Sequence, residues 1–159
     1  MVINYCGAGC FKIQTGGVTI LTEGTEGDVS GRMKPDIFIK TTKNKVTVNA
    51  ENSVLGSGEY EIKGVEITGF PNFVYFVKTE DIRMSFGGGG DDIDILFIED
   101  SAEGAKIARQ LGPKIIVSNS GSCENLEKEL GKKAEALDKL VIKKKEVPME
   151  QLSKLICLK

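Results

Sequence analysis

The chain has 159 residues, of which 40% are hydrophobic and 28% are charged. These values fit one compact domain over residues 1–159 and exclude a disordered or fibrous protein. Lysine plus arginine (21) nearly balance aspartate plus glutamate (23), so no overall field would attract nucleic acid or an anionic membrane, and we expect neither as a partner.

Strands are predicted throughout the first hundred residues. Residues 1–5, 10–14 and 18–22 alternate with glycine-containing turns and predict a three-stranded meander. Residues 23–34 carry scattered glycine and mixed charge, which indicates a loop. Further strands are predicted at residues 36–39, 46–48, 59–62, 65–68, 73–77, 82–86 and 93–98.

Helical patterns begin only after residue 100. Ser101 is predicted to cap a helix that ends at Gly112, and a second helix is predicted near residues 122–130. The strand at 114–118 lies between them, as in an α/β crossover, and short strands at 140–143 and 155–158 close the chain. Strands followed by α/β elements predict stacked sheets with helices outside.

Two segments resemble metallo-β-lactamase-fold hydrolases, in particular the ascorbate-phosphate lactonase-like branch. They are residues 5–22 (Y-C-G-A-G-C-F-K-I-Q-T-G-G-V-T-I-L-T) and residues 57–69 (S-G-E-Y-E-I-K-G-V-E-I-T-G). Weaker matches follow in the family's order at residues 82–86, 92–97, 113–117 and 137–140. The resemblance implies a four-layer αββα sandwich of mixed α+β and α/β character, and a binuclear zinc centre that generates hydroxide.

The residues at the implied metal positions are unsuited to zinc. The chain contains no histidine, the residue that supplies most ligands of such centres. The resemblance places the metal positions at Thr42, Asn44, Thr47, Phe86, Gly89 and Ser120, with Asn119 as the alternative to Ser120. Lys43 and Lys45 would also repel a divalent cation. We therefore expect a degenerate member of the superfamily, without zinc or another cofactor.

Three functions remain open. The leading hypothesis is a non-catalytic protein with a structural or protein-interaction role, self-associating as a homo-oligomer. The first alternative is a metal-dependent hydrolase with a carboxylate site near Asp91, Asp92 and Asp94, although such acidic residues are more often solvated. The second is a small-ligand binder that uses the loop Gly87, Gly88, Gly89 and Gly90, although a glycine loop without the phosphate-binding lysine is more often only a turn.

Other reactive side chains have structural interpretations. Without a secretion signal or an apolar run of ~20 residues, the chain is expected in the cytoplasm, with its four cysteines reduced and buried. Ser118, Ser120 and Ser122 are interpreted as helix caps, since a nucleophilic serine needs a base and Lys114 is the conceivable one. The lysines at 143–145 are interpreted as a solvated strand edge rather than a nucleic-acid site.

Overall fold

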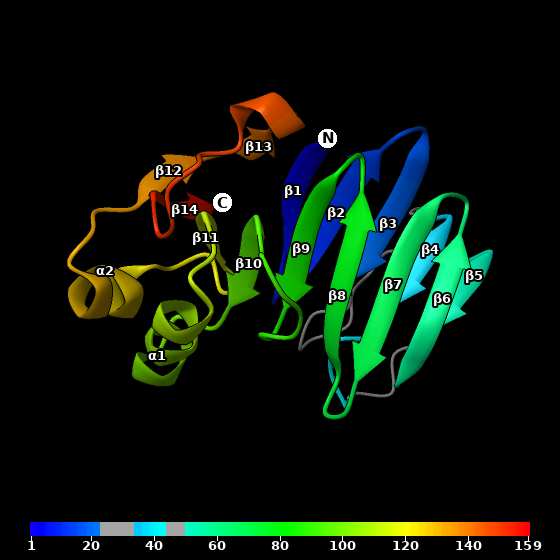
Figure 1. Cartoon of the computed structure of the whole chain (residues 1–159), viewed down its shortest axis with the longest axis horizontal. Coiled ribbons are helices and arrows are strands. Elements are labelled where there is room, and N and C mark those ends of the chain that lie inside the picture. Colours follow the sequence, from blue (N-terminus) through cyan, green and yellow to red (C-terminus); the bar gives the residue numbers. More distant parts are fainter. Residues whose placement is uncertain (23–33, 44–49) are drawn as a thin grey trace.

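The computed structural model describes residues 1–22, 34–43 and 50–159. Two β-sheets lie face to face in it, and the helices gather beside one of them (Figure 1). Within this part of the chain, no helix is long and apolar enough to cross a membrane.

The first sheet has six strands in the order β13-β1-β2-β3-β4-β5. Strands β1, β2 and β3 form the predicted antiparallel meander, and β3, β4 and β5 continue in parallel. The strands are β1 (Val2–Gly7), β2 (Cys10–Thr15), β3 (Val18–Thr22), β4 (Ile37–Ile39), β5 (Asn52–Val54) and β13 (Lys139–Val141).

The second sheet has eight strands in the order β12-β14-β11-β10-β9-β8-β7-β6. It is antiparallel from β6 to β9 and parallel from β9 through β12. The strands are β6 (Gly58–Ile62), β7 (Val65–Phe70), β8 (Val74–Thr79), β9 (Ile82–Phe86), β10 (Ile95–Ile98), β11 (Ile115–Ser118), β12 (Glu135–Leu137) and β14 (Lys154–Leu158).

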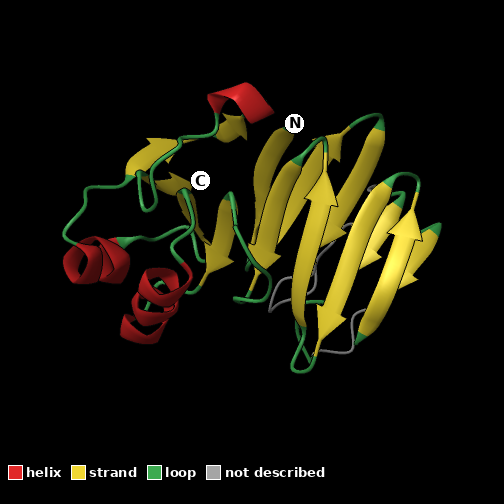
Figure 2. Cartoon of the chain, in the orientation of Figure 1, coloured by secondary structure: helices red, strands yellow, loops and turns green. Residues whose placement is uncertain are grey.

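Two apolar clusters hold these layers together. The larger lies between the sheets and includes Ile3, Ile13 and Val77, all fully buried. The smaller joins β10, β11 and β14 to the helices α1 (Ala102–Leu111) and α2 (Glu124–Leu130). The predicted α/β sandwich is thereby confirmed. Both helices cover the eight-stranded sheet (Figure 2), and a fourth layer on the other sheet stays a prediction.

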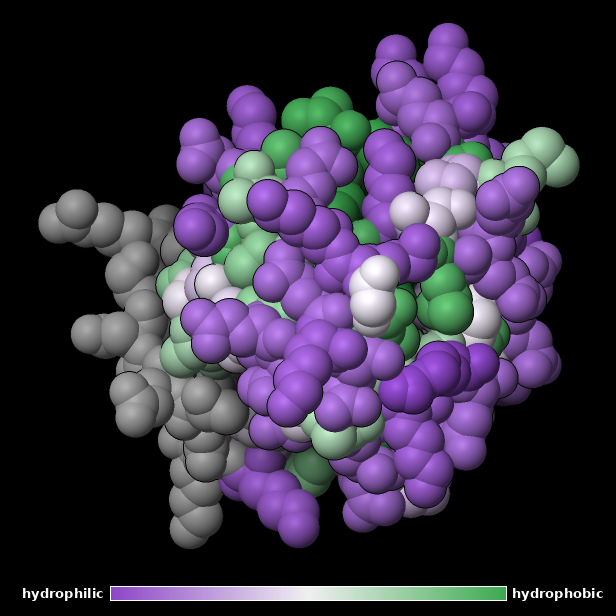
Figure 3. Space-filling model, turned by 90° about the vertical axis from the view of Figure 1, so that its left-hand side faces the viewer, coloured by the Kyte–Doolittle hydropathy of each residue, from purple (hydrophilic) through white to green (hydrophobic). Residues whose placement is uncertain are grey.

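The outward side of the helix layer faces water. Figure 3 shows this side of the molecule covered mainly by hydrophilic residues, with small hydrophobic patches between them. The helices bury residues such as Ala105, Ala108 and Leu126 against the sheet, as amphipathic surface helices do.

The two helices begin differently. Ser101 caps α1 as predicted, since its Oγ accepts a hydrogen bond of 3.0 Å from the Gly104 N–H. The cap position of α2 is Cys123, which makes no side-chain capping bond. Capping by the serines at 118–122 is therefore wrong, because Ser118 and Ser120 share a hydroxyl contact of 3.2 Å and Ser120 donates to the Ser122 carbonyl.

Some elements differ from the sequence prediction. Strands β5 and β12 were not predicted, since their sequences N-S-V and E-A-L lack an apolar alternation. The predicted strand at 46–48 lies outside the described residues. The lysine run contains a 3-10 turn, η1 (Lys144–Glu146), rather than a strand edge.

Candidate functional site

A small pocket opens at one rim of the sandwich, where strands of both sheets end. Its volume is about 120 Å³. Phe86 and Thr22 are the last residues of β9 and β3, and Asn119 directly follows β11. The lining residues are Ala8, Gly9, Phe11, Thr22, Thr41, Thr42, Phe73, Phe86, Gly87, Phe97 and Asn119.

Stacked phenylalanines form the inner wall of this pocket. Phe86 and Phe97 are register partners on neighbouring parallel strands, and their rings stack with centroids 4.5 Å apart. Phe11, from the facing sheet, tilts against Phe97 at 4.8 Å. Phe97 and Phe86 are only 2% and 5% exposed, so the aromatic wall belongs to the core between the sheets.

The polar groups of the pocket are hydroxyls and one amide. Thr22 is fully buried, and its Oγ1 accepts a hydrogen bond of 2.9 Å from the Phe11 N–H. Lys40 Nζ lies 6.0 Å from the ring centroid of Phe73, one of the lining residues. The pocket therefore combines an apolar wall with neutral polar side chains.

The sequence-derived metal positions are only partly gathered here. Thr42 and Phe86 line the pocket, and Asn119 lines it rather than Ser120. Gly89 packs elsewhere, where a Cβ would lie 2.7 Å from the ring of Phe70. Two further positions, 44 and 47, lie outside the described residues.

The glycine loop has a packing explanation. A Cβ at Gly88 would lie 2.8 Å from Ile107, and one at Gly90 would collide with the ring of Phe76. The Ser85 hydroxyl donates a hydrogen bond of 2.6 Å to the Gly89 carbonyl. The loop lies tightly against apolar side chains, which favours the turn interpretation over an anion cradle. Gly87 is the residue of this loop that lines the pocket.

The donor groups at the rim do not fit zinc. Threonine hydroxyls, a neutral amide and phenylalanine rings replace the nitrogen, sulfur and carboxylate donors that zinc prefers. Across residues 1–22, 34–43 and 50–159, no group of three or more histidine, cysteine, aspartate or glutamate side chains could hold a metal ion.

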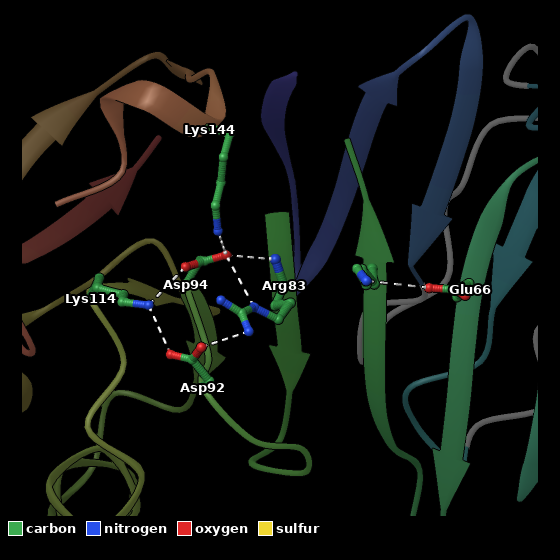
Figure 4. A network of polar contacts seen from close by, with 7 residues as sticks. Glu66, Arg83, Asp92, Asp94, Lys114 and Lys144 are labelled. Carbon is green, nitrogen blue, oxygen red and sulfur yellow. Dashed lines mark hydrogen bonds and ion pairs between the residues drawn. The ribbon is translucent and has the colours of Figure 1, made fainter. Parts of the chain in front are cut away.

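Two of the three acidic candidates, Asp92 and Asp94, contact a group of cations, while Asp91 is exposed. Asp94 directly precedes β10 and is fully buried, whereas Asp92 is 60% exposed. Lys144 Nζ lies 2.8 Å from Asp94 Oδ2, and Lys114 Nζ lies 3.0 Å from Asp94 Oδ1. Arg83 completes the group, with its backbone N–H donating to Asp94 at 2.9 Å and its guanidinium 2.6 Å from Asp92 (Figure 4).

The expectation of solvated carboxylates is therefore wrong for Asp94. Burial raises its pKa, but hydrogen bonds from Lys144, the Arg83 backbone and Lys114 outweigh burial and lower the pKa overall. A carboxylate already neutralised by protein cations has little capacity left for Mg²⁺. Lys144, interpreted from the sequence as solvated, is one of these partners.

A serine–lysine pair is not assembled. Lys114 precedes β11 and bonds Asp92 and Asp94, each at 3.0 Å. Ser118 is the last residue of the same strand, so the two side chains belong to opposite ends of β11.

Comparison of the sequence with known proteins finds no match, whereas comparison of the structure finds similar solved structures. No protein-family model and no curated protein matches the chain. A candidate Zn-dependent hydrolase of the metallo-β-lactamase superfamily from Thermotoga maritima shares 19% identity, with a TM-score of 0.75 over 98% of this chain and 96% of that one.

Two further solved structures are similar over most of their length. The metallo-β-lactamase fold protein YhfI from Bacillus subtilis shares 10% identity, with a TM-score of 0.60 over 99% of this chain and 95% of that one. A metallo hydrolase from Ignicoccus hospitalis also shares 10% identity, with a TM-score of 0.58 over 89% of this chain and 99% of that one. The chain has the metallo-β-lactamase fold.

Proposed function

We propose that this chain is a non-catalytic protein with the metallo-β-lactamase fold, whose rim pocket binds a small, uncharged ring compound. The observation that supports it is the aromatic wall of Phe86, Phe97 and Phe11, where the resemblance implies a metal centre. This proposal keeps the non-catalytic part of the leading hypothesis and replaces its structural or protein-interaction role with the alternative of small-ligand binding, at the rim pocket rather than in the Gly87–Gly90 loop.

Hydrolysis at this rim would lack the groups that usually activate water. A metallohydrolase needs a metal-bound hydroxide or a general base to activate water. The chain has no histidine, and the buried carboxylate Asp94 is held by Lys114 and Lys144. These facts favour binding over turnover.

The volume and lining of the pocket indicate which class of ligand it could bind. A volume of about 120 Å³ compares with the ~150 Å³ apolar cavity known to hold benzene. Phe73 offers a half-buried ring, and the buried rings of Phe11, Phe86 and Phe97 form the apolar wall behind it. Thr42 and Asn119 add neutral polar side chains to the lining. We therefore expect an aromatic ring that carries one hydroxyl or amide.

Binding of phenol as a probe tests this proposal. Phenol at ~100 times its dissociation constant should stabilise the protein by about 2.7 kcal/mol, measured as a rise in melting temperature. Phe73→Ala removes a half-buried ring from the pocket and should weaken binding about tenfold, or ~1.4 kcal/mol.

The matched control is Phe76→Ala, because Phe76 is half-buried but packs on the helix side of its sheet. It should bind phenol as the parent protein does. Equal weakening by both substitutions, or no stabilisation of the parent protein by phenol or benzamide, would contradict binding in the pocket.

Self-association also remains a proposal. Val141 on β13 and Leu55 beside β5 are 57% and 60% exposed, and β13 and β5 are the two edge strands of the six-stranded sheet. Edge strands with exposed apolar residues favour pairing between chains. Sedimentation velocity giving the monomer mass at all concentrations would contradict it.

A further inference from the structure

The four cysteines form two contacting pairs with opposite surroundings. Cys6 and Cys10 flank the turn between β1 and β2, whereas Cys123 directly precedes α2 and Cys157 lies on β14, both in the cluster on the helix side of the sheet. Burial is confirmed for Cys10, Cys123 and Cys157, but the prediction is wrong for Cys6, which is exposed. No disulfide joins any of these four described residues.

Local backbone geometry explains the position of Cys6. Gly7 pairs with Cys10, while Tyr5 pairs with Phe11, so the register shifts between Tyr5 and Gly7 and Cys6 is the extra residue of a bulge. A bulge turns a side chain out of the regular alternation. Here it leaves Cys6 exposed, and it places Cys6 and Gly7 together opposite the single residue Cys10 of the facing strand.

The surroundings of Cys6 stabilise its thiolate. A hydrogen bond from Cys10 has the largest effect, and burial opposes it. The backbone N–H and the charge of Lys12 add to the effect of Cys10, and together they lower the pKa of Cys6 to about 7. About half of such a thiol is ionised at pH 7, against ~3% of an ordinary cysteine.

The second pair is protected. The Cys123 thiol donates to the Ile156 carbonyl at 3.6 Å, and the Cys157 thiol donates to the Gly121 carbonyl at 3.1 Å. Burial, followed by the contact with Cys157, raises the pKa of Cys123 to about 12. Buried thiols react slowly, so this pair, 5% and 6% exposed, is an internal reference.

We propose that Cys6 and Cys10 form a peroxide-sensitive thiol pair, in which a hydroperoxide oxidises the exposed Cys6 and the contacting Cys10 then closes an intramolecular disulfide. The pair flanks the turn whose residues Ala8 and Gly9 line the rim pocket. The oxidation itself does not depend on what that pocket binds.

The chemistry is a two-electron oxidation in two steps. The Cys6 thiolate attacks one oxygen of the hydroperoxide, an S–O bond forms, the O–O bond breaks, and the departing oxygen takes a proton from water and leaves as water or an alcohol. The Cys10 sulfur then attacks Cys6, an S–S bond forms, the S–O bond breaks, and hydroxide leaves with the Cys10 proton as water.

Peptide mapping of the full chain tests the pair. After hydrogen peroxide at pH 7 and blocking under denaturing conditions, we expect a Cys6–Cys10 disulfide in the monomer, with Cys123 and Cys157 still carrying the blocking group. Before oxidation, iodoacetamide should modify Cys6 in the folded protein about 3-fold faster than the same residue in urea, because the larger thiolate fraction outweighs the lower nucleophilicity of a thiolate with a lowered pKa.

Substitutions separate the two roles. Cys10→Ser should leave a sulfenic acid on Cys6 that dimedone traps, and Cys6→Ser should leave Cys10 reduced. Oxidation that produces only disulfides between chains, or equal rates for Cys6 in the folded and unfolded protein, would overturn the proposal. The wild-type map decides the matter even where a variant folds poorly.

Discussion

Asp94→Asn is expected to lower the free energy of unfolding by about 3 kcal/mol, at the lower end of the cost of breaking a buried ion pair. The carboxylate is fully buried, and Lys114 and Lys144 lie within 3.0 Å of it. Without the negative charge of Asp94, the repulsion among Lys114, Lys144 and Arg83 is less well balanced. The cost is not larger because Lys144 and Arg83 are 42% and 29% exposed.

Urea unfolding at pH 7 measures this loss, and Asp92→Asn is the matched control. Asp92 contacts Lys114 and Arg83 but is 60% exposed, so water screens these ion pairs and the loss of Asp92 should cost clearly less stability than the loss of Asp94. Equal costs for the two substitutions would contradict a special role for the buried carboxylate.

The difference in stability between the parent protein and Asp94→Asn should depend on pH in a defined direction. The pKa of Asp94 is lowered in the folded state, so its contribution is present above the unfolded value of ~3.9 and is lost as pH falls through the folded pKa. The difference in unfolding free energy between the parent protein and Asp94→Asn should therefore shrink below pH ~4.

Phe97→Ala is expected to cost about 3–5 kcal/mol of unfolding free energy. The ring is 2% exposed and lies between Phe86 and Phe11, at 4.5 and 4.8 Å. Its removal opens a cavity between the sheets, which the strands β9 and β10 cannot close without losing their register.

Phe97→Leu serves as the control, since it keeps most of the apolar volume and should cost less than half as much. Chemical unfolding and far-UV circular dichroism would follow both variants. A loss of about 1 kcal/mol or less for Phe97→Ala would mean that the aromatic wall is a loose surface feature and not part of the core.

Strand and helix patterns predicted most of the fold. The meander at the start of the chain and the strand 82–86 follow from β-branched and apolar alternation between glycine turns. The cap at Ser101 follows from its hydroxyl. Strands β5 and β12 have three residues each, and they are strands because neighbours pair with them rather than because of local preference.

The candidate site was less accessible from the sequence. The pocket is lined by residues from both sheets. The sequence of one strand does not show which residues of the other sheet it will face. The Asp94 network did leave a signal, because Asp94 and Lys114 each precede a strand of similar apolar character, and those strands pair in parallel from Ile95 and Ile115. Polar residues in equivalent places on neighbouring parallel strands lie side by side, which would have predicted the ion pair.

Metal content tests the central claim most directly. The untagged protein, produced in zinc-supplemented medium and passed through gel filtration, would be measured by inductively coupled plasma mass spectrometry against its molar concentration. We expect zinc well below one ion per chain, because the rim offers threonine, asparagine and phenylalanine side chains. About two tightly held zinc ions per chain, the content of a binuclear hydrolase centre, would contradict it.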